Sequence, residues 1–427
     1  MTEPAGLSTR EAAERLGVKP ETVYAYVSRG LLTSRRAAGG RGSTFDAQEV
    51  DALARRHRRP ASDATPTTTG TPGAPGVGAI RTGITFIDKG RYYFRGVDAT
   101  ALAQRYGYEE AAEWLWTGVL RPGTRFTAPR ETLSAARRAV GALPAHSGPV
   151  DRLRVAAIAA AAADPLRFDL SPEAVLGSAR ALIPTLVDAL PPAGGTEAGD
   201  PDAEEGALAR RLWSRLTDRS PDDASLRALD TALVLLIDHD LAASTLAVRV
   251  AASARAHPYA VVSAGLGTLE GPLHGAASGL AHRFLTDVLQ RGSAAPVVAD
   301  QLRTGRRVPG LGHRLYPGED PRAQALFRLL DGIPAAAPAL GAARDVVETT
   351  ARHVPLHANV DLALAVLSVS AGMPAEAGET VFAVARTAGW IAHALEEYEE
   401  HPLRMRPVGH YDGPKPPQPL PLPLPPP

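Results

Sequence analysis

Three histidines of this chain lie in short stretches rich in glycine or charge rather than on apolar helix faces. His239 stands between two aspartates, His274 lies in Gly-Pro-Leu-His-Gly, and His313 follows Pro-Gly-Leu-Gly. A carboxylate, Asp361, follows Asn359 and precedes an apolar run. A carboxylate acts as a base near neutral pH only where burial raises its pKa. Such polar residues at the ends of elements predict a catalytic or binding site assembled from several turns.

The elements that must position these turns are mostly helices. After about residue 79 the apolar residues show helical spacing, with short Gly/Pro breaks and no sustained alternation. Two short segments, Ile84–Asp88 and Tyr92–Arg95, predict one small hairpin. The Gly-, Pro- and acid-rich stretch Pro191–Glu205 predicts a surface loop, and Gly265–Gly271 predicts a turn before His274. The predicted fold class is mainly α.

Composition divides the chain into four parts. Residues 1–60 are compact and helical in pattern, and residues 61–78 consist largely of Thr, Pro, Gly and Ala, which predicts a flexible linker. A single long region covers residues 79–413. Nine of the residues in 414–427 are proline, which predicts an extended polyproline II tail.

The residue counts exclude several classes of protein. The chain has no cysteine, which excludes disulfide scaffolds, thiolate metal sites and cysteine nucleophiles. With 46 basic and 46 acidic residues its net charge is zero, which excludes a uniformly basic nucleic-acid-coating protein. No apolar stretch approaches the roughly 18–20 residues of a membrane span. The N-terminus has neither a basic start nor an apolar signal core, so we expect a cytoplasmic, unprocessed chain without membrane contact.

The first sixty residues show the pattern of a helix-turn-helix. Ser8 and Glu11 form a capping box that starts one helix, which should end near Gly17. Pro20 opens a second helix that runs to about Arg29. The apolar residues expected to pack between the two helices are Ala12, Leu16, Val23 and Val27. A basic, glycine-rich stretch, Arg35–Gly42, predicts a wing, and Asp46–Glu49 begins a third helix in the manner of a capping box.

This head resembles the excisionase and MerR-type winged helix-turn-helix families, which implies contact with double-stranded DNA through residues 1–60. Residues 1–60 carry a net charge of +4, and the remainder of the chain therefore carries −4. A basic head is compatible with DNA binding. The alternative is a small helical protein-interaction module with no DNA target.

The region from Gly78 to Gly413 resembles the citrate synthase family. The resemblance rests on segments that occur in the family's order, namely Gly83–Asp88 with Tyr93–Gly96, Asp238–Thr245, Gly271–Gly275, Pro309–Tyr316 through Asp320–Ala323, Asn359–Asp361, Ala385–His393, and Arg406–Pro407 followed by Tyr411 and Gly413. It implies a two-domain helical body with a small subdomain at about residues 265–370. It also implies condensation of acetyl-CoA with oxaloacetate and hydrolysis of the citryl thioester, with no further cofactor and no metal.

The resemblance assigns roles to three catalytic residues. Asp361 matches the family's catalytic aspartate, which takes a proton from the acetyl methyl group. His274 would supply a donor to the enolate oxygen, and His313 would polarise the ketone of oxaloacetate.

The resemblance also implies the substrate ligands. The oxaloacetate ligands would be His239, Arg322 and Arg386, with Arg406 reaching in from the second subunit of a homodimer. Acyl-CoA would lie against the loop before His313, with basic residues nearby for its phosphates. These predicted CoA contacts are Val308, Gly310, Leu311, Gly312, Arg306 and Arg307, with Arg303 beside them.

Several residues depart from the family pattern beside these ligands, namely Ala242, Ala276, Ser278, Ala358 and Val408. The activity of a 2-methylcitrate synthase, which uses propionyl-CoA, therefore stays open. One extra methylene group changes the binding free energy in a pocket by only about 1–3 kcal/mol, so the sequence does not rank the two substrates. A DNA-binding regulator with a metabolite-sensing body is the alternative from another class. The spacing of His393 with Glu396, and of Glu397 with His401, imitates a metal site, and we interpret it as a solvated polar helix face.

Overall fold

The computed structural model describes residues 80–195, 206–271 and 274–407 together with parts of both ends of the chain. At the ends it describes residues 7–16, 18, 20, 23, 26, 27, 32–36, 43–47, 49–51, 411–415, 417, 418 and 420. The chain divides into two compact units, Met1–Ala74 and Pro75–Pro427, which we call the head and the body. The predicted linker at 61–78 and most of the predicted tail at 414–427 lie outside the described residues.

The head combines a helix with a small sheet. Its sheet has the order β1-β3-β2, with all pairs antiparallel, and consists of β1 (Leu7–Ser8), β2 (Ser34–Arg36) and β3 (Ser43–Phe45). The strands β2 and β3 flank the predicted wing, whose middle lies outside the described residues. The first helix, α1 (Thr9–Leu16), ends as predicted just before Gly17. Of the predicted second helix, Pro20, Val23, Tyr26 and Val27 are helical, and its bounds lie outside the described residues.

The predicted packing of the head is confirmed. Its buried core contains Ala12, Leu16 and Val23, with Val27 packed against it, together with Ala13, Leu32, Phe45 and Val50. The Ser8 capping box is also confirmed, because the Glu11 carboxylate accepts from the Ser8 amide at 2.8 Å and the Glu11 amide donates to Ser8 Oγ at 3.3 Å.

The start of the third head helix is capped only in part as predicted. The Glu49 amide donates to Asp46 Oδ1 at 3.2 Å. The Glu49 carboxylate instead accepts from the Thr33 amide at 2.9 Å, and so fixes the backbone just before β2.

The body begins with the predicted hairpin, extended by one strand. The strands β4 (Thr85–Asp88), β5 (Arg91–Phe94) and β6 (Val97–Asp98) pair antiparallel in that order. Lys89 and Gly90 connect β4 to β5 with φ of 48° and 77°. Positive φ at both central residues is typical of a type I′ turn, whose twist suits a two-residue hairpin.

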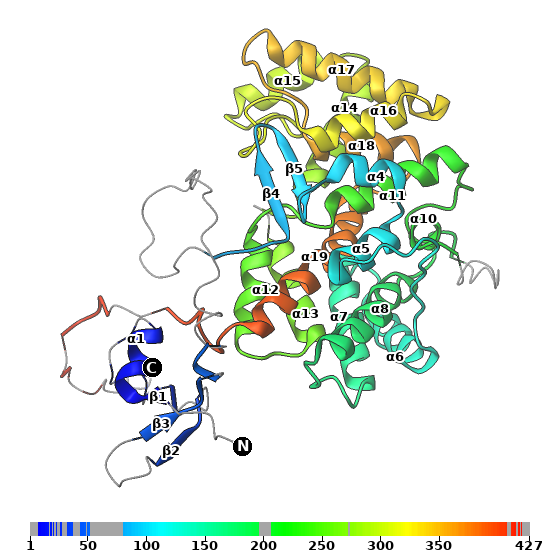
Figure 1. Ribbon diagram of the computed structural model, residues 1–427. Coiled ribbons are helices and arrows are strands. Elements are labelled where there is room, and N and C mark those ends of the chain that lie inside the picture. The colour runs from blue at the N-terminus through cyan, green and yellow to red at the C-terminus, as the bar shows by residue number, and fades with distance from the viewer. Residues whose placement is uncertain are drawn as a thin grey trace. The chain divides into compact units, whose positions relative to one another are not determined.

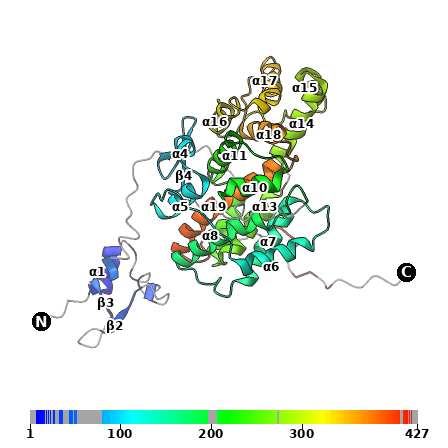
Figure 2. The same cartoon turned by 90° about the vertical axis from the view of Figure 1, so that its right-hand side faces the viewer.

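The remainder of the body is mostly helical, which confirms the predicted fold class. Its helices are α4 (Ala99–Arg105), α5 (Tyr108–Thr117), α6 (Arg130–Gly141), α7 (Pro149–Ala163), α8 (Pro172–Asp188), α10 (Leu208–Leu216), α11 (Asp223–Leu236), α12 (Ala243–Ser253), α13 (Pro258–Leu269), α14 (Ala277–Arg291), α15 (Ala294–Arg303), α16 (Pro321–Leu330), the 3-10 turn η1 (Pro334–Ala336), α17 (Ala337–Ala351), α18 (Val360–Ser370) and α19 (Ala377–Glu399). The helices α14 to α18 gather at one end of the body, and α6, α7 and α8 lie at the other (Figures 1 and 2).

Helix α19 forms the centre of the body. It packs against helices from both ends, including α5, α8, α11, α12, α13 and α14. Its Trp390 is fully buried and lies so close to α13 that a Cβ on Gly265 would stand 2.7 Å from the indole. Glycine at 265 therefore permits a close helix approach, and the prediction of a turn beginning at Gly265 is wrong, because α13 continues to Leu269.

The predicted loop at Pro191–Glu205 joins α8 to α10. Residues 191–195 are mostly exposed and non-helical, and residues 196–205 lie outside the described residues. Among the described residues, no helix is long and apolar enough to cross a membrane.

Candidate active site

The loop that carries His313 is bonded to the segment that carries Asp361. The Gly312 amide donates to the His357 carbonyl at 2.8 Å, and the Asn359 amide donates to the Gly310 carbonyl at 2.9 Å. Gly310 has φ of +79°, and a Cβ there would lie 2.8 Å from the Leu362 Cβ. Glycine is therefore required at 310 for the backbone to approach α18 this closely.

Two of the predicted histidines meet at a tyrosine. His239 Nε2 is bonded to the Tyr316 hydroxyl at 2.7 Å, and the rings of His239 and His313 lie 5.1 Å apart, edge to face. The His313 ring lies 4.9 Å from the Tyr316 ring. Burial, together with the nearby Arg322, holds the pKa of His239 well below its usual value. His239 is therefore neutral at physiological pH.

The tautomer of His313 follows from its backbone contact. The Leu315 amide donates to His313 Nδ1 at 3.1 Å, so the neutral ring carries its proton on Nε2. Burial and the charge of Arg322 lower the pKa of His313 to about 4. His313 is therefore a neutral donor through Nε2 across the physiological range.

Two buried arginines give the site a positive potential. Arg322, at the start of α16, forms a bidentate pair with Asp320 through Nε and Nη2, at 3.0 and 2.7 Å. Arg386, on α19 and 1% exposed, donates from Nε to the Leu236 carbonyl at 2.9 Å and has no ion pair among the described residues. Burial lowers the pKa of Arg386 to about 10, and the charge of Arg322 contributes to that shift. A buried guanidinium without a carboxylate partner is a ready site for an anionic ligand.

Asp361 is a carboxylate adapted to act as a base. It lies in the first turn of α18, where its amide donates to the Asn359 side chain at 3.0 Å. Desolvation raises the pKa of Asp361 to about 6, although the nearby Arg322 opposes the shift. The carboxylate is therefore ionised at pH 7 and much more basic than an ordinary aspartate.

His274 joins the cluster from the segment before α14. His274 Nε2 is bonded to Ser244 Oγ at 2.8 Å, and its ring lies 6.2 Å from Phe382. Phe382 lies under the guanidinium of Arg386, whose Cζ is 4.5 Å from the ring centre. Burial and the charge of Arg386 lower the pKa of His274, which favours its neutral form. Ser244 uses Nε2, so Nδ1 is the nitrogen left for a ligand.

Comparisons with known proteins show the family of the body and the domain type of the head. A family model described as the citrate synthase C-terminal domain matches residues 73–408, and a helix-turn-helix domain matches residues 7–58. The chain belongs to the citrate synthase family. It is therefore an acyltransferase of the citrate synthase type, and its first part carries a helix-turn-helix domain.

Individual relatives place the chain within this family. The citrate synthase of Haloferax volcanii is 32% identical over 354 residues, which are 78% of this chain and 93% of that protein. The crystal structure of citrate synthase from Pyrobaculum aerophilum superimposes with a TM-score of 0.68 at 27% identity, over 81% of this chain and 93% of that one. The 2-methylcitrate synthase 1 of Corynebacterium glutamicum is 26% identical over 345 residues, which are 75% of this chain and 88% of that protein.

The predicted CoA loop of this citrate synthase family member is partly buried. Val308, Gly310 and Leu311 are buried, whereas Arg306 and Arg307 are exposed. Arg303 is also exposed, and its guanidinium is bonded to Asp300. The arginines near the loop are thus at the surface, and Arg303 already has a carboxylate partner.

Arg406 is the predicted oxaloacetate ligand that the structure does not bring to the others. Its side chain is exposed, whereas His239, Arg322 and Arg386 are buried. Its amide donates to the Leu403 carbonyl at 3.0 Å in the turn after α19. This position is compatible with the prediction that a second subunit uses Arg406.

The sequence interpretation of the α19 polar residues is partly wrong. His393 and Glu397 are fully buried, so they do not belong to a solvated face. His393 and Glu397 each contact Arg249, which is also buried. No group of three or more His, Cys, Asp or Glu that could hold a metal is found among the described residues.

Two residues of the cluster were missed as site residues. Tyr316 contacts both His239 and His313, and Asp320 holds Arg322 while also accepting from the Val360 amide at 3.1 Å. Both occur in the motif that contains His313 and Arg322. Their position between two predicted ligands was the available signal.

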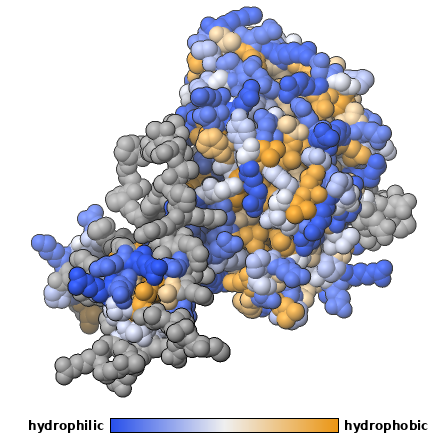
Figure 3. All heavy atoms as spheres, in the orientation of Figure 1, coloured by the Kyte–Doolittle hydropathy of each residue, from blue (hydrophilic) through white to orange (hydrophobic). Residues whose placement is uncertain are grey.

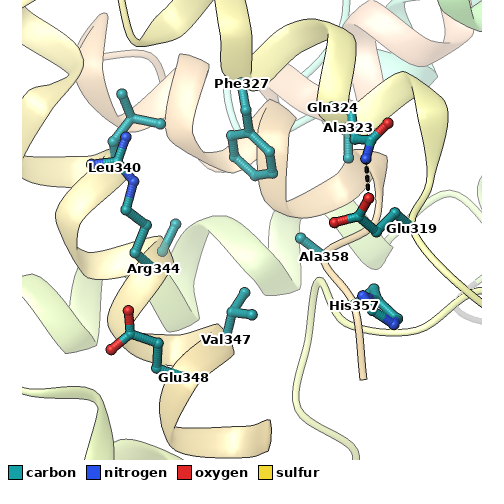
Figure 4. Close-up of a pocket in the computed structure, with 11 residues that line it drawn as sticks. Glu319, Ala323, Gln324, Phe327, Leu340, Arg344, Val347, Glu348, His357 and Ala358 are labelled. Atoms are coloured by element: carbon teal, nitrogen blue, oxygen red, sulfur yellow. Dashed lines mark hydrogen bonds between the residues drawn. The ribbon is translucent and has the colours of Figure 1, made fainter. Parts of the chain in front are cut away.

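A separate cavity of about 290 Å³ lies beside this site, between α16 and α17 (Figure 4). Phe327 projects from α16 toward the cavity, with Arg344 and Val347 on the opposite side. His357 and Ala358 complete its wall, and none of the predicted site residues lines it. The cavity is therefore distinct from the cluster described above.

Proposed function

We propose that this protein is a citrate synthase that condenses acetyl-CoA with oxaloacetate in the cytoplasm, without any cofactor or metal besides its substrates. The single observation that carries this proposal is the partly buried Asp361. Desolvation raises its pKa to about 6, although the positive charge of the nearby Arg322 opposes the shift. Such a carboxylate can remove a weakly acidic proton near neutral pH. A positive pocket beside it suits a dicarboxylate.

The residues assign each proton of the proposed reaction. Asp361 takes a methyl proton from the acetyl group, and His274 stabilises the enolate oxygen through its Nδ1 proton. The enolate carbon then forms a bond to the ketone carbon of oxaloacetate, and the ketone oxygen takes the proton of His313 Nε2. Water hydrolyses the resulting citryl thioester to citrate and free CoA, and the proton held by Asp361 replaces the one lost from His313, so both residues return to their starting states.

The substrate carboxylates would bind to the positive side of the pocket. Arg386 offers its terminal nitrogens, since only its Nε is bonded to Leu236. Arg322 offers Nη1, since Asp320 uses Nε and Nη2. His239 adds a hydrogen bond, and acyl-CoA would lie along Val308–Gly312.

Propionyl-CoA is the second candidate substrate, and the likeness to a 2-methylcitrate synthase favours it. The test measures CoA release with oxaloacetate and either acetyl-CoA or propionyl-CoA, for the wild type and Asp361→Asn. We expect turnover with acetyl-CoA to exceed turnover with propionyl-CoA. A larger kcat/KM with propionyl-CoA than with acetyl-CoA would identify the protein as a 2-methylcitrate synthase. If neither acyl-CoA gives the wild type more turnover than Asp361→Asn, the proposed enzymatic activity is refuted.

A homodimer is part of the proposal, and exposed apolar side chains support it. Ile158 on α7 and Val250 on α12 are 60% and 45% exposed, and Leu246 lies one turn before Val250. Figure 3 shows apolar residues on the face of the body that this view presents. A second copy covering these side chains would remove them from water. Light scattering should therefore give twice the chain mass, and a monomer would contradict this.

We also propose that the helix-turn-helix head contacts double-stranded DNA, with the match over residues 7–58 in support. A regulator with a metabolite-sensing body is the alternative that this head favours. A gel shift with the adjacent promoter should lose its signal when residues 1–60 are deleted. Binding that survives the deletion would refute the role of the head.

A further inference from the structure

A buried polar cluster adjoins the candidate active site at Asp238, the residue before His239, and the proposed reaction uses none of it. It consists of Asp238, Arg249, His393, Glu396, Glu397 and Arg404, and we call it the Arg249 cluster. Arg249 is 1% exposed, and His393 and Glu397 are fully buried. Buried charges contribute little net stability compared with apolar residues of the same volume. We therefore expect the cluster to position neighbouring residues rather than to stabilise the fold.

One chain of hydrogen bonds in the cluster runs from Arg249 through His393 to Asp238. Arg249 Nη1 is bonded to His393 Nδ1 at 2.9 Å, and His393 Nε2 is bonded to Asp238 Oδ1 at 3.2 Å. A guanidinium has only donors, so Nδ1 of His393 accepts and Nε2 carries the ring proton. Arg249 thereby fixes the tautomer in which His393 donates to Asp238.

This chain of hydrogen bonds ends next to His239, a proposed oxaloacetate ligand. Asp238 directly precedes His239, and its second oxygen accepts from Thr85 Oγ1 at 2.5 Å. Bonds from His393 and Thr85 and the charge of Arg386 outweigh burial and lower the pKa of Asp238. An ionised Asp238 held by two donors fixes the backbone on which His239 bonds to Tyr316.

The second chain of hydrogen bonds runs from Arg249 to the turn that carries Arg406. Arg249 Nε and Arg404 Nη2 both donate to Glu397 Oε2, at 3.2 and 2.6 Å. The other oxygen, Oε1, is buried and has no hydrogen-bond partner among the described residues. Glu397 therefore depends on these two arginines, and the turn after α19 depends on Glu397.

Further contacts hold this turn in place. The Leu403 amide donates to the Ser253 carbonyl at 2.7 Å, and Met405 is buried. Arg406 follows directly. The Arg249 guanidinium thus contacts His393, which holds the residue before His239, and Glu397, which holds the turn before Arg406.

We propose that Arg249 is a positioning residue for oxaloacetate, which holds His239 through His393 and Asp238 and holds the Arg406 turn through Glu397. This inference rests on the proposed function, because His239 and Arg406 are oxaloacetate ligands only there. Arg249 has no contact with the loop proposed for acyl-CoA among the described residues. Its loss should therefore affect one substrate and spare the other.

The test compares the two KM values in Arg249→Met. We expect the KM for oxaloacetate to rise at least tenfold while the KM for acyl-CoA stays within twofold. Arg249→Lys should give an intermediate rise, because an ammonium cannot replace three bonds of a planar fork.

A second pair of variants keeps the test valid if Arg249→Met does not fold. His393→Leu removes both bonds of that residue and should reproduce the oxaloacetate effect. His393→Gln can still accept from Arg249 and donate to Asp238, and should restore a nearly normal KM.

The matched control is Arg211→Met. Arg211 forms an equally buried pair with Asp188, on α10 and α8. We expect Arg211→Met to lower Tm without a selective change in the KM for oxaloacetate. Parallel changes of both KM values in Arg249→Met, or the same selective change in Arg211→Met, would overturn the inference.

Calorimetric titration of oxaloacetate separates this inference from the proposed function. If the wild type binds oxaloacetate and turns over, and Arg249→Met binds it equally well, only the positioning role is wrong. If the wild type neither binds oxaloacetate nor turns over, the proposed function is wrong and the inference falls with it.

Discussion

The body buries the charges of its candidate site, whereas the head exposes its charges. In the body, Arg322 and Arg386 are almost fully buried. In the head, the side chains of Arg10 and Glu14 are 87% and 69% exposed, and only a small apolar core holds the domain together. Buried charges cost stability and are tolerated by a large core, whereas a domain of about 50 residues has little stability to spare. Substitutions at the candidate site of the body should therefore change chemistry, and substitutions in the head core should act through folding.

The largest effect is expected at Asp361. Asp361→Asn should lower kcat by about 10²–10⁴-fold, the usual contribution of general base catalysis. Because burial raises the pKa of Asp361, the ionised carboxylate destabilises the fold above the unfolded pKa. Asp361→Asn should therefore leave Tm at pH 7 unchanged or higher, as measured by calorimetry. A lower Tm together with the loss of kcat would contradict the separation of chemistry from stability.

The pH profile of the wild type tests the same residue. The base must be ionised, so kcat/KM should fall as the pH drops below about 6, where Asp361 takes up a proton. His313, with its pKa lowered to about 4, stays neutral over this range and should not contribute. A profile that is flat down to pH 5 would exclude Asp361 as the base.

The opposite result is expected for a core residue of the head. Phe45, the last residue of β3, is 1% exposed and belongs to the buried core of the head together with Ala12 and Leu16 of α1. Phe45→Ala should destabilise the head by about 3–5 kcal/mol, enough to unfold a small domain. Hydrogen exchange should then show a loss of protection in residues 7–51 only, with kcat within twofold of the wild type. A parallel loss of kcat would show that the two units do not act independently.

A substitution at Arg386 should produce a smaller effect on chemistry. Arg386→Lys keeps the positive charge but removes the planar guanidinium. In the wild type, that group donates from Nε to the Leu236 carbonyl and leaves its two terminal nitrogens for a ligand. A bond to a charged group contributes about 1.5–3 kcal/mol, so the KM for oxaloacetate should rise about 10–100-fold. Steady-state kinetics with Arg130→Lys, on the exposed start of α6, supplies the control. An unchanged KM would remove Arg386 from the substrate site.

The sequence predicted more of the site's residues than of its arrangement. Ordered motifs identified His239, His274, His313, Arg322, Asp361 and Arg386, and the structure brings these together. It did not predict Asp320 as the partner of Arg322, because the place of Asp320 in the motif between His313 and Arg322 does not show which side chain it bonds. It misjudged His393 and Glu397, because helical spacing shows which residues share a face and not whether that face is buried. Gly265 was misread as a turn because the close approach of Trp390 comes from a distant part of the chain.

The smallest effect is expected at the capping box of the head. Ser8 Oγ accepts from the Glu11 amide, and the Glu11 carboxylate accepts from the Ser8 amide. Burial contributes little at this exposed position, and these bonds lower the pKa of Glu11. Ser8→Ala should cost about 1 kcal/mol of head stability, measured by urea unfolding of residues 1–74, and should leave DNA binding at low temperature nearly unchanged. Ser8→Asp keeps a capping oxygen and should restore most of the loss. If Ser8→Ala instead abolishes DNA binding without lowering stability, then Ser8 contacts the ligand, and the head carries function on this turn as well as on its surface charges.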